Sequence, residues 1–157
     1  MAPEETRLTL IEYLSETEEA IARLYEAYSN TQPEHEEFWF GKVIQEADHS
    51  SHIHELIHKL KNGSATFTVD AAMTDAIHKL DEFLERELKR TKVENMSFTD
   101  ALEVAIQIEK SVAKQGFYSF LKNPSGNINE TIQRLRHDDA GHVKFLEREL
   151  EKYREGT

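Results

Sequence analysis

The chain has 157 residues, a formal net charge of −11 and no cysteine, with 31% charged and 38% hydrophobic residues. This length suffices for a real core, and we expect one domain over residues 1–157. The acidic charge disfavours a nucleic-acid partner, because phosphate binding needs an excess of Lys and Arg, and it disfavours docking on anionic lipid. The lack of cysteine excludes disulfides, thiolate zinc sites and cysteine-ligated iron–sulfur clusters.

The first residues, Met1 to Glu5, have neither a basic start nor an apolar run, so no signal peptide is expected. No window approaches the roughly 18–20 apolar residues that a membrane span requires. We therefore expect a cytoplasmic protein with no membrane partner.

Apolar residues recur with a helical period along most of the chain. The first helix is predicted over residues 5–29, with an apolar stripe formed by Leu10, Ile11, Leu14, Ile21, Leu24, Tyr25 and Tyr28. Its polar face is predicted to hold Glu12, Ser15, Glu19 and Glu26. The second helix has Pro33 in its first turn and ends at the cap Asn62-Gly63. Its apolar positions are Trp39, Val43, Ile53, Ile57 and Leu60.

A further helix is predicted over residues 69–90, inside a connection too long for an ordinary loop. Ser97 to Asp100 resemble a capping box and open the third core helix, which is expected to continue to the turn at Asn123-Pro124. Its apolar stripe is Leu102, Ala105, Ile106, Val112, Ala113, Phe117 and Phe120. The last helix is predicted to end near Tyr153. The predicted fold is all-α: four core helices form two antiparallel hairpins, joined by a long crossover that contains the extra helix.

Six polar residues interrupt these apolar stripes. They are Glu18 on the first helix, Glu46 and His49 on the second, Glu109 on the third, and Asp139 and His142 on the last. Buried, ionised carboxylates are costly unless a counter-charge is present. Two divalent cations would neutralise the four acids, and the acid-x-x-His spacing places each acid and its imidazole on one helix face. Glu from two helices and acid-x-x-His from two others form the inward-facing ligand set of carboxylate-bridged di-iron or di-manganese bundles.

At these residues the chain resembles the ferritin-like superfamily, and within it the rubrerythrin-like group. The resemblance lies in Glu18 followed by Tyr25, Phe38-Trp39 before Glu46-x-x-His49, the segment Ile108-Glu109-Lys110, and Asp139-x-x-His142 before Phe145-Leu146. It implies a ferritin-like four-helix bundle with two metal ions, most often iron, bound by the six residues. It also implies an oxidoreductase of the peroxidase or ferroxidase type, in which ferrous iron reacts with hydrogen peroxide or dioxygen. The residues expected to take part in catalysis are Glu18, Glu46, Glu109 and Tyr25.

The chain departs from the rubrerythrin pattern in three ways. Asp139 stands where Glu is usual, and Val112 stands where rubrerythrins have a further Glu, so the ligand exchange linked to that Glu is not expected. The cysteine-ligated rubredoxin domain is missing, so a separate protein would have to donate electrons. A homodimer is expected by analogy alone.

Several alternatives stay open. The metals could be manganese or zinc, since these ligands suit all three. The centre could be a ferroxidase that serves iron storage or handling, or a structural site without catalysis. Tyr25 and Tyr118 could relay an electron or serve as core residues. His54-Glu55-x-x-His58 matches the zinc-protease motif. Because the inward face of this helix is set by Ile53 and Ile57, we interpret that match as coincidental and expect His52, His54 and His58 on the surface.

Overall fold

The structure is a computed structural model that describes residues 4–61, 66–67, 71–115, 121–122 and 126–156, with side chains for residues 12–59, 72–113 and 130–156. Five α-helices make up most of this part: α1 Glu4–Thr31, α2 Glu36–Lys61, α3 Ala71–Val93, α4 Phe98–Gln115 and α5 Gly126–Glu155. A 3-10 turn, Pro33–His35, joins α1 to α2. The predicted all-α class is confirmed. No described helix is both long enough and apolar enough to cross a membrane.

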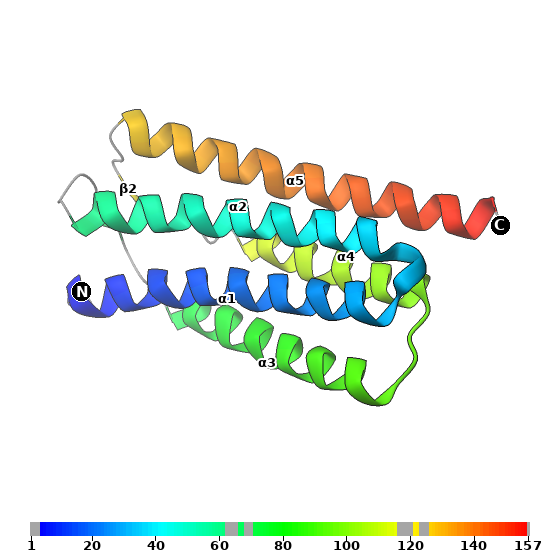
Figure 1. Cartoon of the computed structure of the whole chain (residues 1–157). Helices are drawn as coiled ribbons and strands as arrows, with labels where there is room; N and C mark the ends of the chain where they lie inside the picture. The colour runs from blue at the N-terminus through cyan, green and yellow to red at the C-terminus, as the bar shows by residue number, and fades with distance from the viewer. Residues whose placement is uncertain (1–3, 62–65, 68–70, 116–120, 123–125, 157) are drawn as a thin grey trace.

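The helices lie side by side as two antiparallel pairs, α1 with α2 and α4 with α5 (Figure 1). The pairs meet where α2 packs on α5. Helix α3 packs on α1 and α4 and runs the length of the molecule, so that α4 begins at the same end as α2. The predicted crossover helix is therefore present, and it makes α2 and α4 run in the same direction.

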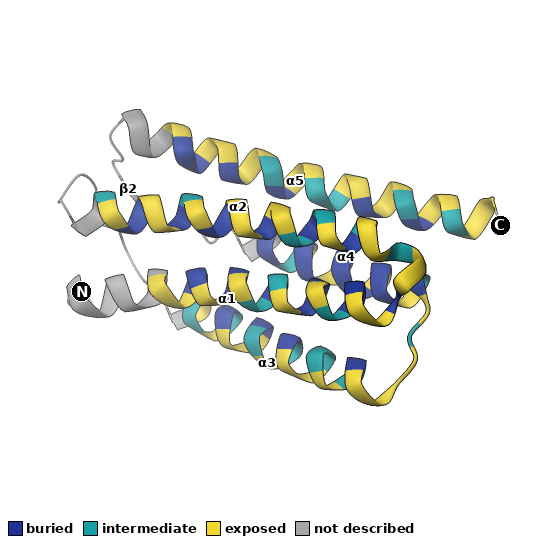
Figure 2. Ribbon diagram, viewed as in Figure 1, coloured by how far each residue is buried: buried dark blue, intermediate teal, exposed yellow. Residues whose placement is uncertain are grey.

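Each helix turns one face toward a shared interior (Figure 2). Helix α1 has neither Gly nor Pro, and its buried residues include Leu14, Ile21 and Leu24 from the predicted stripe. Ser15 was predicted on the polar face of α1, but only 2% of its surface is exposed. Its hydroxyl oxygen lies 3.1 Å from Nε2 of His54, because α2 packs closely over this side of α1 and gives the small polar side chain a partner.

The third core helix is shorter than predicted. Helix α4 ends at Gln115, and β2 (Leu121–Lys122) pairs antiparallel with β1 (Thr66–Phe67) instead of continuing the helix. The extended backbone exchanges hydrogen bonds with a segment from the crossover, and a helix to Asn123 would remove that pairing. Ala113, predicted as an alternative stripe position, is exposed, whereas Val112 is buried. Phe117 and Phe120 lie outside the described residues.

One end of the bundle is held by the side-chain amide of Gln32. Its Oε1 accepts a 2.7 Å hydrogen bond from Nε1 of the fully buried Trp39. Its Nε2 donates to the backbone oxygens of Met96 and Ser97, both at 3.2 Å. This one side chain therefore ties the α1–α2 turn to the α3–α4 turn. Ser97 also caps α4, where its hydroxyl accepts the N–H of Asp100 at 3.1 Å.

Replacing this amide should destabilise the fold. In Gln32→Ala the indole N–H and two carbonyls lose their partners, and a buried group without a partner costs about 1–3 kcal/mol. Urea unfolding should show that loss, whereas Gln107→Ala on the exposed face of α4 should change stability little. Equal midpoints for the two variants would contradict the role given to Gln32.

Candidate metal centre

The structure brings together the six residues that interrupt the apolar stripes. They form three overlapping groups in which one nitrogen or oxygen atom from each residue lies within 4.8 Å of the others. The groups are Glu18/Glu46/His49, Glu46/Glu109/His142 and His49/Asp139/His142. We refer to Glu18, Glu46, His49, Glu109, Asp139 and His142 as the six-residue centre. Glu46 belongs to two of the groups and contributes to both without a change of position.

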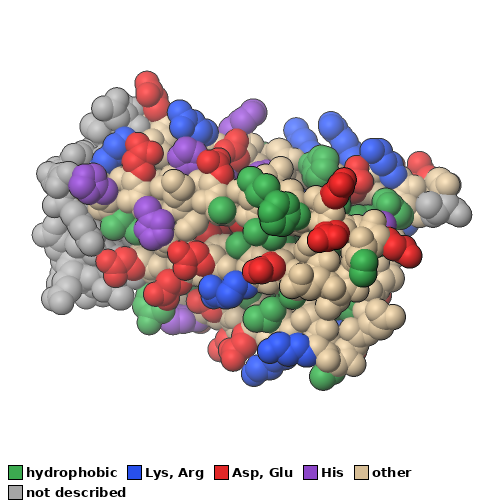
Figure 3. Space-filling model, in the orientation of Figure 1, with side chains coloured by type: hydrophobic (Ala, Val, Ile, Leu, Met, Phe, Trp, Pro, Cys, Tyr) green, Lys and Arg blue, Asp and Glu red, His purple; other side chains and the backbone are tan. Residues whose placement is uncertain are grey.

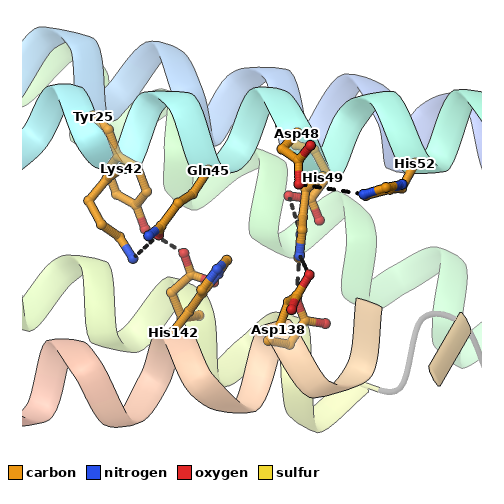
Figure 4. A network of polar contacts seen from close by, with 11 residues as sticks. Tyr25, Lys42, Gln45, Asp48, His49, His52, Asp138 and His142 are labelled. Carbon is orange, nitrogen blue, oxygen red and sulfur yellow. Dashed lines mark hydrogen bonds and ion pairs between the residues drawn. The ribbon is translucent and has the colours of Figure 1, made fainter. Parts of the chain in front are cut away.

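The two imidazoles approach each other from α2 and α5 (Figure 4). Their ring centroids are 5.1 Å apart. Nδ1 of His49 lies 3.8 Å from Oε2 of Glu18 and 3.5 Å from Oδ1 of Asp139. Nδ1 of His142 lies 3.8 Å from Oε2 of Glu109. These distances exceed those of good hydrogen bonds, so the groups converge without fully satisfying one another.

Several polar atoms of the centre have no hydrogen-bond partner among the described residues. They are Oε1 of Glu18, both carboxylate oxygens of Glu46, Nε2 of His49, Oδ1 of Asp139 and Nδ1 of His142. Glu46 is the extreme case, since it is 1% exposed and neither of its oxygens accepts a hydrogen bond from a described donor. Buried polar groups nearly always have partners, so atoms without one call for a specific explanation.

Two of the acids hold protons unusually strongly. Burial raises the pKa of Glu46 well above its usual value, and the charges of Glu109 and Glu18 raise it further. Burial also raises the pKa of Asp139, to about 8, although the nearby His49 imidazole opposes the shift. The raised pKa of Glu46 means that this carboxyl group carries a proton. Without metal, protons therefore reduce the charge of the centre.

The pKa of Glu109, by contrast, is lowered. Burial favours a raised pKa for Glu109, but the nearby side chains of His142 and Glu46 and the charge of Lys42 outweigh it and lower the pKa to about 2. For His49, burial favours a lower pKa, yet Glu18 and Asp139 outweigh it and raise the pKa to about 9. The centre therefore combines an ionised carboxylate on α4 with protonated groups on α2 and α5.

Tyr25 is attached directly to the centre. Its hydroxyl donates a 2.9 Å hydrogen bond to Oε1 of Glu109, and its side chain is fully buried. Burial and the charge of Glu109 raise the pKa of Tyr25 well above its usual value, so the phenol keeps its proton and remains a donor. This leaves Oε2 of Glu109, which faces His142, as the oxygen free to bind a metal ion.

Lys42 is a charged residue of the site that the sequence reasoning missed. It is 2% exposed, and its Nζ donates to Oε1 of Gln45 at 2.8 Å and lies 5.5 Å from the ring centroid of Phe145. Burial lowers the pKa of Lys42, while Glu109 and Glu46 act in the opposite direction. Its position four residues before Glu46 places both on one helix face, and that spacing was the available signal.

Asp138 was missed as well. Its Oδ2 lies 3.9 Å from Nε2 of His49, and Figure 4 shows Asp138 on α5 below the tip of the ring. The distance is too long for a hydrogen bond, so Asp138 adds negative charge beside the ring without fixing its orientation. Asp138 directly precedes the candidate ligand Asp139. Because consecutive residues of a helix point in different directions, the sequence contained no sign that Asp138 also approaches His49.

The zinc-protease motif does not form a site among the described residues. His54 and His58 are exposed, His52 is half-buried, and none of the three belongs to a group that could hold a metal ion. His52 instead lies 3.5 Å from Asp48 on the outer side of α2. Tyr118 lies outside the described residues.

Comparison of this chain with protein-family models, curated proteins and solved structures found no match. The function therefore has to be argued from the centre itself.

The donor set fits a pair of divalent cations. Carboxylate oxygens and imidazole nitrogens are ligands for iron, manganese and zinc, and four carboxylates balance two divalent ions. The added charges of Lys42 and Asp138 are opposite in sign and leave this balance unchanged. The unpartnered atoms of Glu18, Glu46, Asp139 and His142 are those that a bound cation would satisfy.

Without metal, the stability of the protein should fall as pH rises. The raised pKa values of Asp139 (about 8, usual 3.8) and His49 (about 9, usual 6.5) mean that the folded chain binds more protons than the unfolded chain. Their stabilisation is fully present below the usual values and is lost as pH rises through about 8 and 9. The melting temperature of metal-free protein should therefore drop between pH 5 and 9, and Asp139→Asn should flatten the drop. A melting temperature that rises over this range would contradict the assigned protonation.

Glu46→Leu should separate stability from metal binding. Removing a buried carboxyl group that has no partner should stabilise metal-free protein by about 1–3 kcal/mol, whereas the variant should lose the stabilisation that added metal gives the natural chain. Chemical unfolding with and without metal measures both effects. Glu26→Leu, on the exposed face of α1, is the matched control and should keep the metal response. A Glu46→Leu variant stabilised by metal as strongly as the natural chain would remove Glu46 from the ligand set.

Proposed function

We propose that this chain is a rubrerythrin-like di-iron protein with a ferritin-like bundle, which reacts ferrous iron with hydrogen peroxide or dioxygen. The observation that carries the proposal is the convergence of four acids and two histidines from four helices, with six of their buried nitrogen and oxygen atoms lacking a hydrogen-bond partner among the described residues. An ordinary helical interior gains nothing from this arrangement, because each buried acid costs free energy that Leu or Val would not.

The path of the chain supports the ferritin-like assignment. The pairs α1–α2 and α4–α5 each contribute one helix with a single acid and one with acid-x-x-His, and α3 provides the crossover between the pairs. Among the four acids, Glu46 alone belongs to two of the three groups, so it would lie beside both ions, while Glu18 with His49 and Glu109 with His142 would each help to hold one ion.

Two bound ferrous ions would supply the two electrons that, with two protons, reduce hydrogen peroxide to two water molecules. The residues of the chain hold the ions, balance their charge and keep protons at defined atoms. The Tyr25 hydroxyl holds Glu109 in position and keeps a proton next to the centre. Lys42 places a positive charge near Glu46 and Glu109, and Asp138 places a negative charge near His49.

The two residues that differ from the rubrerythrin pattern, Val112 and Asp139, are both buried. Val112 is buried three residues after Glu109, so α4 adds no further carboxylate at that position. Asp139 is buried beside His49, with Oδ1 3.5 Å from Nδ1. We therefore propose a fixed set of six ligands without redox-linked exchange.

The decisive experiment is metal analysis of protein loaded anaerobically with ferrous iron, followed by rapid mixing with hydrogen peroxide or air-saturated buffer. We expect two irons per chain and near-ultraviolet absorption that appears on oxidation and disappears on reduction. The faster oxidant distinguishes a peroxidase from an oxidase. Continued oxidation of ferrous ions well beyond two per chain would instead favour iron handling.

Tyr25→Phe tests the residue assignment within the same experiment. It keeps the ring but removes the hydrogen bond to Glu109, and loss of such a supporting contact typically costs about 10- to 100-fold in metal affinity or activity. Tyr13→Phe, on the exposed part of α1, is the matched control and should behave like the natural chain. Protein that binds zinc or no metal and gives no spectral change with either oxidant would refute the redox function.

A further inference from the structure

A surface groove between α1 and α2 reaches the six-residue centre. It has a volume of ≈ 540 Å³ and is open to solvent. Its lining is formed by Glu19, Ala22, Arg23, Glu46, Ala47, Ser50, Ser51 and His54, which we call the α1–α2 groove. Glu46 is the link to the interior, because it lines the groove while only 1% of its surface is exposed.

The outer end of the groove carries groups that can ligate a cation. Oε1 of Glu19 lies 3.7 Å from Nε2 of His54, and the hydroxyl oxygen of Ser15 lies 3.1 Å from the same nitrogen. The side chains of Glu19 and His54 are 49% and 60% exposed, so both can reach a hydrated ion. Figure 3 shows histidine and acidic side chains next to one another over α1 and α2 on this face.

The path from the outer end to the centre follows α2. His54, Ser50 and Glu46 are spaced four residues apart and therefore lie in a row on one helix face, spanning about 12 Å. The remaining lining residues of α2 and Ala22 of α1 are small, which leaves the space open. At the inner end, both oxygens of Glu46 are buried and lack a partner among the described residues.

We propose that the α1–α2 groove is the route by which a divalent metal ion reaches the six-residue centre, with Glu19 and His54 as a weak transfer site at its outer end. The site is exposed and has few ligands, so an ion captured there can be released inward to Glu46. Arg23 in the lining opposes a cation, and Glu19 offsets its charge at the outer end. This proposal rests on the proposed function only in that the centre takes up metal.

The test measures the rate of Co(II) uptake by anaerobic, metal-free protein from the visible absorption that appears on binding. In Glu19→Gln/His54→Gln we expect uptake about 10-fold slower, with the same final number of bound ions, because the groove loses local attraction for cations. Glu55→Gln/His58→Gln is the matched control, since it removes the same residue types from exposed positions outside the groove lining.

Ala47→Leu supplies a second variant, which obstructs the groove without changing charge. It should also slow uptake at unchanged stoichiometry, whereas Ala72→Leu, at an exposed position on α3, should not. Arg23→Gln should leave uptake equal or faster. Natural uptake rates in both groove variants, or equal slowing in the controls, would overturn the route.

The outcomes also separate this proposal from the redox function. Slow uptake in the groove variants together with no reaction of iron-loaded protein with either oxidant would support the route and refute only the redox chemistry. A natural chain that takes up no Co(II) would overturn both.

Discussion

Mutual repulsion among four acids enclosed in a helical interior is the main electrostatic constraint on this protein. Glu18, Glu46, Glu109 and Asp139 are each no more than 3% exposed, and their oxygens face one another and two imidazoles instead of water. In a medium of low dielectric constant, such charges cannot all remain ionised without compensation. Protons on Glu46 and Asp139 are one form of compensation, and cations are the other. The competition between protons and cations makes metal binding, stability and pH parts of one equilibrium.

The two halves of the centre resemble each other in sequence but differ in environment. On one side, Glu109 accepts a hydrogen bond from Tyr25, has a pKa of about 2 and faces the half-buried His142. On the other side, Asp139 has a pKa of about 8 and faces the buried His49. Two ions bound here would therefore occupy unequal positions, and the position beside Glu109 would require less proton release. That asymmetry arises from neighbours on other helices and not from the ligand types.

The centre is densely packed on one side and open to a surface groove on another. Toward one end, Trp39 packs between Tyr25 and Tyr28, with ring centroids 5.6 Å and 4.8 Å away, and its N–H is held by Gln32. Large aromatic side chains make this end dense and connect it to Tyr25. On the α1–α2 face, by contrast, small residues such as Ala47 and Ser50 leave a groove that reaches Glu46. The two features can coexist because different residues of α2 form them: Trp39 belongs to the aromatic cluster, whereas Ala47 and Ser50 line the groove.

The helical period of the amino-acid sequence is enough to predict the helices and the inward position of the six residues. Apolar residues recur with the period of the α-helix, so a polar residue in phase with Leu14 and Ile21 must point inward with them. Local pattern also predicted the cap at Ser97, and the long connection predicted a crossover. It predicted the end of α4 wrongly, because the pairing of Leu121–Lys122 with Thr66–Phe67 joins segments that no local signal relates.

Contacts between groups on different helices follow from the packing of the helices and could not be predicted from the period of any one of them. The hydrogen bond from Tyr25 to Glu109 spans 84 residues, and the approach of Asp138 to His49 joins α5 to α2. The burial of Lys42 and Ser15 likewise depends on the distance between packed helices, which the period of one helix does not contain. Periodicity specifies the direction of a side chain from its own axis. Its partners, its pKa and its access to solvent depend on what the other helices place opposite it.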